Sequence, residues 1–201
     1  MKKKTKMKKN RTLFIVLAAV VLLVLWGISM FNGLVTKEEG VDAQWANVET
    51  SYQRRADLIP NLVATVKGYA DFEQETLTQV IEARAKATSI TIDPSNLTPQ
   101  NIAQFQAVQD DLSSALSRLL VTIERYPDLK ANQNFLELQA QLESTENRIS
   151  VERRKFNEKA KDFNATIRRI PRNIVANIAG MEKRGYFESA AGAETAPAVT
   201  F

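Results

Sequence analysis

The stretch that decides the fold is residues 54–70, RRADLIPNLVATVKGYA. Here and just before it, apolar and aromatic residues recur at spacings of three and four, the pattern of one buried face of an α-helix. The positions on this face are Trp45, Val48, Tyr52, Arg55, Ile59, Leu62, Val66 and Tyr69. A charged Arg55 interrupts the face, and Pro60 lies inside the helix, where proline removes a hydrogen bond. The pattern predicts a helix over residues 41–69 with two features that need a reason.

Pro60 has two interpretations. Asp57 could cap a helix that restarts there, which would place Pro60 in a first turn, where proline costs little. Alternatively the helix continues and kinks at Pro60, and the carbonyl of Ala56 loses its partner. The sequence leaves both open.

The composition excludes much chemistry. The 201 residues include no Cys and no His, which removes thiolate nucleophiles, disulfides, imidazole bases and the commonest zinc ligands. Of the 27 basic residues, seven precede residue 12, which leaves 20 against 23 acidic residues in the rest of the chain. The basic net charge therefore belongs to residues 1–12, and no nucleic-acid partner is expected.

Residues 13–31, LFIVLAAVVLLVLWGISMF, form an uncharged run. As a helix it would span about 28 Å, close to the thickness of a bilayer core. A cleaved signal peptide is the alternative, but its apolar run is normally shorter and residues 28–30, Ile-Ser-Met, make a poor cleavage site. A single-pass membrane anchor is favoured. The basic flank, residues 1–12, predicts a cytoplasmic N-terminus and a domain outside the membrane.

The rest of the chain reads as helices joined by short connections. After a juxtamembrane segment at residues 32–40, helices are expected over residues 41–69, 72–88, 99–126 and 131–170, with a short helical piece after Pro171. Separate coiled coils are an alternative, but short connections favour an all-α, antiparallel up-and-down four-helix bundle of long helices, preceded by one N-terminal transmembrane helix. The bundle domain is expected over residues 32–184, followed by a flexible C-terminal tail, residues 185–201.

The last long helix has one apolar residue in every seven: Phe135, Leu142, Ile149, Phe156, Phe163 and Ile170. A neighbouring position is mostly polar: Thr145, Glu152, Lys159 and Thr166. Because the first and last helices of such a bundle are antiparallel neighbours, Arg55 is expected to pair with Glu146 or Glu152. Solvated surface, a buried network that sets the packing register and a ligand or partner site remain alternative interpretations of these polar residues. Asn157 and Asn164, one heptad apart, are expected to bond to neighbouring backbone or water rather than to a ligand.

Close acidic pairs raise the question of catalysis. They are Glu73/Glu75, Asp110/Asp111 and Glu143/Glu146. None has a histidine companion, a glycine-rich loop or the spacing of a calcium loop. A glycosidase-type pair stays open, but solvated surface is the simpler interpretation. No catalytic residue, cofactor or metal ligand is assigned, and the chain is not expected to be an enzyme.

Several runs resemble the LemA family: residues 42–45 (Asp-x-x-Trp), 54–63, 66–70, 82–85 (EARA), 126–132 (YPDLKAN) and 145–149 (TENRI). The family motif residues are Arg54, Asp57, Pro60, Asn61, Asn147 and Arg148. Members often carry His after the Tyr-Ala of residues 69–70, whereas this chain has Asp71. The resemblance implies a bacterial single-pass membrane protein with an antiparallel helical bundle and no defined activity.

Together these features favour a membrane-anchored, non-enzymatic helical scaffold or interaction protein of the bacterial cell envelope. The expected partners are the membrane and other envelope proteins, with self-association as a further expectation. A membrane-remodelling or lipid-contacting assembly protein is the first alternative, and it would need an exposed basic or apolar stripe. A carboxylate-based hydrolase is the second.

Overall fold

The computed structural model describes residues 2–68 and 73–188, with side chains from residue 13 onward. These residues form helices and turns without a strand, so the all-α prediction is confirmed. The helices are α1 Lys2–Lys67, α2 Gln74–Ser89, the 3-10 helix η1 Pro94–Asn96, α3 Pro99–Ile123, α4 Pro127–Lys130, α5 Gln133–Ile167 and α6 Arg172–Ile178. The predictions for Tyr69, Phe72 and residues 189–201 lie outside the described residues.

α1 is one unbroken helix of 66 residues. It contains a segment long and apolar enough to cross a membrane, and it continues without a turn through residues 32–40, where a separate juxtamembrane segment was expected. That expectation was wrong because the Lys and Glu residues there are good helix formers, and because Leu34 and Val41 are fully buried in the bundle core. The apolar segment and the bundle therefore share one helix.

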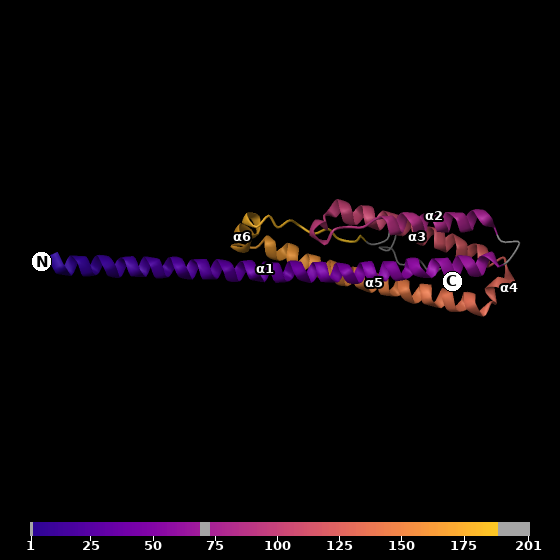
Figure 1. Ribbon diagram of the computed structural model, residues 1–201, viewed down its shortest axis with the longest axis horizontal. Coiled ribbons are helices and arrows are strands. Elements are labelled where there is room, and N and C mark those ends of the chain that lie inside the picture. Colours follow the sequence, from indigo (N-terminus) through magenta and orange to yellow (C-terminus); the bar gives the residue numbers. More distant parts are fainter. Residues whose placement is uncertain (1, 69–72, 189–201) are drawn as a thin grey trace, which may run out of the picture.

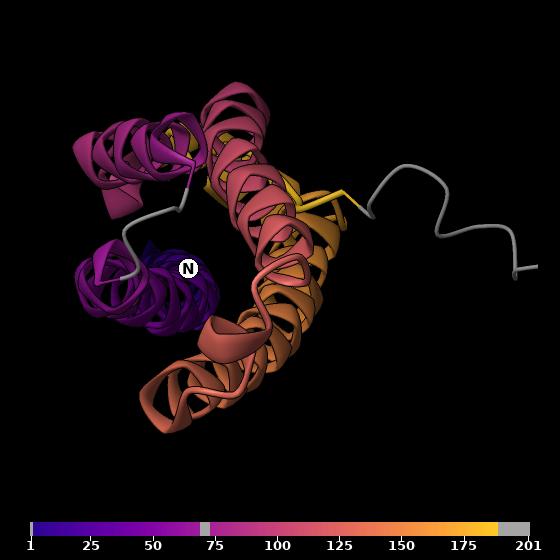
Figure 2. The same ribbon diagram turned by 90° about the vertical axis from the view of Figure 1, so that its right-hand side faces the viewer.

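The long helices run along a common axis (Figure 1). α1 packs mainly along α5, and α2 packs along α3. The N-terminal part of α1 extends beyond the bundle on its own (Figure 1). Viewed from the opposite end, the four long helices surround a shared interior (Figure 2).

α1 passes through Pro60 without ending. Pro60 has no N–H to donate to the carbonyl of Ala56, so that carbonyl needs another partner. Arg84 of α2 supplies it, since its Nε donates to the Ala56 oxygen at 2.8 Å. Asp57 does not cap a new helix; its carboxylate accepts from the side chain of Gln53 at 2.7 Å. The continuous helix is the correct alternative, and Arg84 satisfies the carbonyl that the proline frees.

The helix starts follow local capping signals. Thr98 caps α3, with its hydroxyl accepting from the N–H of Asn101 at 3.3 Å, and Pro99 is the first helical residue, as predicted. α5 begins at Gln133 because the Asn132 side chain accepts from the N–H of Phe135 at 3.1 Å. α5 also ends at Ile167, so Ile170 lies outside it. The prediction that Ile170 continues the buried heptad was wrong, since it is 84% exposed.

The core has two apolar clusters, stacked along the bundle. One holds Ile59, Leu62 and Val66 of α1 with partners from α2, α3, α4 and α5. The other holds Leu34, Val41, Trp45, Val48 and Tyr52 of α1 with partners from η1's flanks, α3, α5, α6 and Phe187. Arg55 lies between the α1 residues of the two clusters. The interruption seen in the sequence thus marks a boundary inside the core.

Candidate functional site

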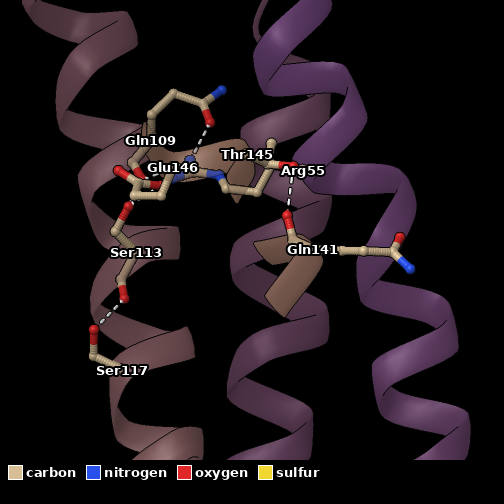
Figure 3. Close-up of polar contacts among 7 residues, drawn as sticks. All are labelled: Arg55, Gln109, Ser113, Ser117, Gln141, Thr145 and Glu146. Atoms are coloured by element: carbon tan, nitrogen blue, oxygen red, sulfur yellow. Dashed lines mark hydrogen bonds and ion pairs between the residues drawn. The ribbon is translucent and has the colours of Figure 1, made fainter. Parts of the chain in front are cut away.

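At the boundary between the clusters lies a group of polar side chains, here called the polar layer: Arg55, Gln109, Ser113, Thr145 and Glu146. They come from α1, α3 and α5 (Figure 3). Arg55, Gln109 and Thr145 are buried. Each occupies a position that the heptad pattern would otherwise give to an apolar residue, so the layer interrupts all three helices at one level.

Arg55 is the centre of the polar layer, with only 2% of its surface exposed. Its Nη1 donates to Ser113 Oγ at 2.7 Å and to Glu146 Oε2 at 3.0 Å. Its Nη2 donates to the backbone and side-chain oxygens of Gln109 at 3.1 and 2.8 Å. The guanidinium also lies 5.1 Å from the ring centroid of Tyr52, close enough for a cation–π contact.

Gln109 extends the layer to α2, because its Nε2 donates to the carbonyl of Ala87 at 3.1 Å. Thr145 turns its hydroxyl back to the Gln141 carbonyl of its own helix at 2.8 Å (Figure 3). Arg55 is thus connected directly or through one residue to all the other long helices. Burial raises the pKa of nearby Tyr52 to about 12, with the charges of Arg153 and Arg55 opposing the rise.

The structure brings Arg55 and Glu146 together and leaves Glu152 out. Glu152 lies farther along α5, where its carboxylate accepts from Gln44 at 2.6 Å and from Lys155 at 3.0 Å. These hydrogen bonds lower the pKa of the Glu152 carboxyl. The expectation of Glu152 as an alternative partner for Arg55 was therefore wrong. Glu146 is 56% exposed, so it reaches the buried guanidinium from the surface.

The family motif residues do not line the polar layer. Arg54, Asp57, Pro60, Asn61, Asn147 and Arg148 are all exposed on α1 and α5. In the motif Arg-Arg-Ala-Asp, Arg55 and Ala56 are buried, whereas Arg54 and Asp57 are exposed. The motif residues therefore lie on the exposed surface of the helices that supply the polar layer.

A second buried arginine, Arg184, was missed by the sequence reasoning. It is 7% exposed, and its guanidinium donates to Glu38 Oε1 and to the carbonyl of Ser95, both at 2.8 Å. Asp42 Oδ1 lies 3.7 Å away, within ion-pair distance. Burial raises the pKa of the Asp42 carboxyl, with Arg184 opposing and Glu38 adding to the rise. The sequence shows its acidic partners, Glu38 and Asp42, near the start of the bundle, but nothing in the sequence connects them with residue 184.

Arg184 begins a segment, residues 184–188, here called the C-terminal strap. Three side-chain amides each bond both backbone groups of one strap residue. The pairs are Asn164 with Arg184, Asn157 with Phe187, and Gln106 with Glu188. The distances run from 2.8 to 3.1 Å. Because an extended segment has no helical partners for its N–H and C=O groups, these amides satisfy its backbone.

The strap also fills the core. Phe187 is 5% exposed and stacks on Trp45 with ring centroids 6.0 Å apart, with Phe105 and Phe156 edge-on at 6.5 and 5.5 Å. A side chain at Gly185 would place its Cβ 2.8 Å from the Cα of Pro99, so only glycine fits. The tail was expected to be loose from residue 185, but its first four residues pack against α3 and α5.

Beside the strap, α5 forms a surface groove of about 800 Å³. Its charged lining is balanced: Arg153, Arg154, Lys161, Glu146, Glu158 and Glu188. Arg153 is already engaged, since it donates to the Glu188 carbonyl at 2.8 Å and lies 4.8 Å from the Phe187 ring centroid. The groove therefore has neither a single charge sign nor a converging set of free polar groups.

The acidic residues do not converge within the described part of the chain. No cluster of three or more carboxylates that could hold a metal occurs there. Asp42 and Glu49 are the carboxyls whose pKa is raised, in both cases chiefly by burial. They lie seven residues apart on α1, about 10 Å along the helix. Asp42 faces Arg184, whereas Glu49 lines a separate cavity of about 90 Å³.

These features define a class of protein: a helical bundle on a long apolar N-terminal helix, braced by two buried arginines and a C-terminal strap. The family model described as the LemA family matches residues 44–201, and the chain belongs to this family.

Named relatives agree with that assignment. Magnetosome protein MamQ 2 of Paramagnetospirillum magneticum is 24% identical over 191 residues, covering 85% of this chain and 68% of the relative. Magnetosome protein MamQ of Magnetospirillum gryphiswaldense is 24% identical over 189 residues with the same coverage. Protein LemA of Metamycoplasma hominis is 26% identical over 145 residues, covering 72% of this chain and 63% of the relative.

Proposed function

We propose that this chain is a single-pass, non-enzymatic scaffold of the bacterial cell envelope. Residues 13–31 cross the membrane, residues 1–12 lie in the cytoplasm, and the bundle stands outside and binds other envelope proteins or further copies of itself. The charge distribution supports this orientation, because the basic cluster at the N-terminus favours the cytoplasmic side.

The observation that carries the proposal is the continuity of α1 from Lys2 to Lys67. A helix that leaves the apolar segment and enters the core without a break joins anchor and bundle stiffly, because every intervening residue is hydrogen-bonded along the helix. The polar layer then ties that helix to its neighbours through Arg55. A stiff, braced bundle suits a role in presenting surfaces at a fixed place on the membrane.

Orientation is tested by cysteine labelling. The chain has no Cys, so Val121→Cys, at an exposed position on α3, gives a single reactive thiol. A membrane-impermeant maleimide should label it in intact cells or, for an outer-membrane species, after the outer membrane is permeabilised. Labelling that occurs only after the inner membrane is broken would contradict the proposed orientation.

The scaffold role is tested by site-specific photo-crosslinking in native membranes, scanned along the exposed positions of α1 and α5. Arg54 and Arg148 sample the exposed motif residues, and Val121 on α3 serves as the comparison site. A defined adduct from one face, containing another envelope protein or a second copy of this chain, is expected. A scan in which no face gives a reproducible adduct would refute the scaffold role.

A lipid-contacting role is the second candidate. It is supported by the exposed apolar and basic side chains of residues 168–183. This segment contains α6, which lies at the end of the bundle nearest the N-terminal extension (Figure 1). The two candidates are compatible, because a scaffold that touches the bilayer is held in one position.

A further inference from the structure

We infer that residues 168–183, which comprise α6 and its flanking turns and are here called the α6 tip, form a second membrane contact that rests on the lipid surface beside the anchor. The inference depends on the proposed membrane anchoring by residues 13–31. Its partner is the phospholipid interface, with acyl chains for the apolar residues and phosphates for the basic ones.

The position of the α6 tip comes from the packing of its inner face. Ala176 is buried, and Val175 and Met181 pack against the same core cluster that contains Leu34. Leu34 lies three residues beyond Phe31, which is about 4.5 Å of helix rise past the end of the apolar run. α6 contacts α1 and lies at the end of the bundle nearest the N-terminal extension (Figure 1). A membrane crossed by residues 13–31 would therefore lie directly against it.

The outer face of the α6 tip is apolar. Ile170, Ile174 and Ile178 are 84%, 58% and 83% exposed. Ile174 and Ile178 are four residues apart in α6, so they lie on the same side of the helix. Exposed isoleucines at this density are costly in water, whereas the headgroup boundary of a bilayer can accept them.

The charge of the α6 tip fits an anionic lipid surface. It contains Arg168, Arg169, Arg172 and Lys183, all exposed, against a single acid, Glu182. The rest of the chain after residue 11 has 16 basic residues and 22 acidic ones. The nearest acid on α5, Asp162, is already bonded to Lys37. The α6 tip therefore carries a net positive charge within a domain that is otherwise net acidic.

The test uses full-length protein in vesicles, with single cysteines carrying an environment-sensitive fluorophore and lipids carrying a quencher at interfacial depth. Ile174→Cys and Ile178→Cys report the α6 tip. Leu23→Cys reports the anchor, and Val121→Cys is the matched control because it is equally apolar, 71% exposed and far from α6 along the bundle. Vesicles of phosphatidylcholine are compared with vesicles that also contain phosphatidylglycerol.

At an insertion depth of roughly 5–10 Å, fluorescence at residues 174 and 178 should fall by about half, while that at residue 121 stays unchanged. The loss should increase with phosphatidylglycerol and shrink when Arg168, Arg169 and Arg172 are replaced by Gln. If residue 23 is quenched but residues 174 and 178 behave like residue 121, the inference is overturned and the anchor stands. If residue 23 is not quenched either, the membrane anchoring itself fails.

Discussion

The ion pair between Arg55 and Glu146 offers an asymmetric test of the polar layer. Glu146→Ala removes a carboxylate that is 56% exposed and leaves a guanidinium that is 2% exposed without its counter-charge. Alanine is the best helix former, so the backbone of α5 gains rather than loses from the change. Any loss of stability therefore comes from the interaction with Arg55.

The expected cost follows from the geometry. A hydrogen bond to a charged group contributes about 1.5–3 kcal/mol net. Solvent reaches the Glu146 side of the pair and screens it, which places the effect at the lower end, about 1.5–2 kcal/mol. For a chain of this size that corresponds to a fall in Tm of roughly 3–8 °C.

The measurement is thermal unfolding of the full chain in nanodiscs, followed by far-UV circular dichroism, as a double-mutant cycle with Arg55→Met. In the Arg55→Met background Glu146 has no buried charge to pair with. Glu146→Ala should therefore change the free energy of unfolding by close to nothing there. Glu143→Ala is the matched control, because Glu143 is an exposed acid on α5 bonded to Gln139. Its effect should stay within about 0.5 kcal/mol. Equal losses from Glu146→Ala with and without Arg55 would refute the reasoning.

Three further changes probe the strap, the proline site and an acid. Gly185→Ala places a Cβ 2.8 Å from the Cα of Pro99, so it should lower stability by about 1–3 kcal/mol and make the strap a protease site. Arg84→Met leaves the carbonyl of Ala56 without its partner and should cost about 1–3 kcal/mol in the same unfolding assay. Because the pKa of Glu152 is lowered from its ordinary value of 4.5, its ionised carboxylate stabilises the fold at pH values above 4.5. This stability is lost as the pH falls through the lowered pKa. Glu152→Gln should reduce this loss of stability at low pH, as measured by thermal unfolding over a series of pH values.

Matched variants separate these effects from general damage. Gly33→Ala adds a Cβ with nothing within 4 Å, so it should not destabilise, and equal losses at residues 33 and 185 would contradict the account of the strap. Pro60→Ala restores an N–H near the Ala56 carbonyl and should reduce the cost of Arg84→Met. An unchanged cost would show that Arg84 does not act on that carbonyl. If Glu152→Gln leaves the loss of stability at low pH unchanged, Glu152 does not contribute to that pH dependence.

The helices of the fold can be predicted from the spacing of apolar residues in the sequence. The three–four spacing around residues 45–66 predicts the buried face of α1, and the Thr98-Pro99 pair predicts the start of α3, because both signals are local. Arg55 could be singled out for the same reason, since a charge on an apolar face stands out. Its partners could not all be named, because Gln109 and Ser113 look like ordinary polar helix residues until α3 is placed.

The misses have physical causes of two kinds. Residues 32–40 were expected to form a separate segment, but burial of Leu34 and Val41 in the bundle core keeps them helical. The strap escapes sequence reasoning because the three side-chain amides that bond its backbone lie 20 to 82 residues away and follow no period. Asn157 and Asn164 were expected to bond to neighbouring backbone or water. They bond instead to the backbone of Phe187 and Arg184, which only the tertiary fold brings beside them.

The central claim is that anchor and bundle share one stiff helix. Amide hydrogen exchange of the full chain in nanodiscs tests it most directly, by comparing residues 32–40 with residues 44–52 of the same helix. The account predicts similarly slow exchange in both stretches, as expected for continuous helix held by core packing. Fast exchange confined to residues 32–40 would show a flexible connection between membrane and bundle and would contradict the claim.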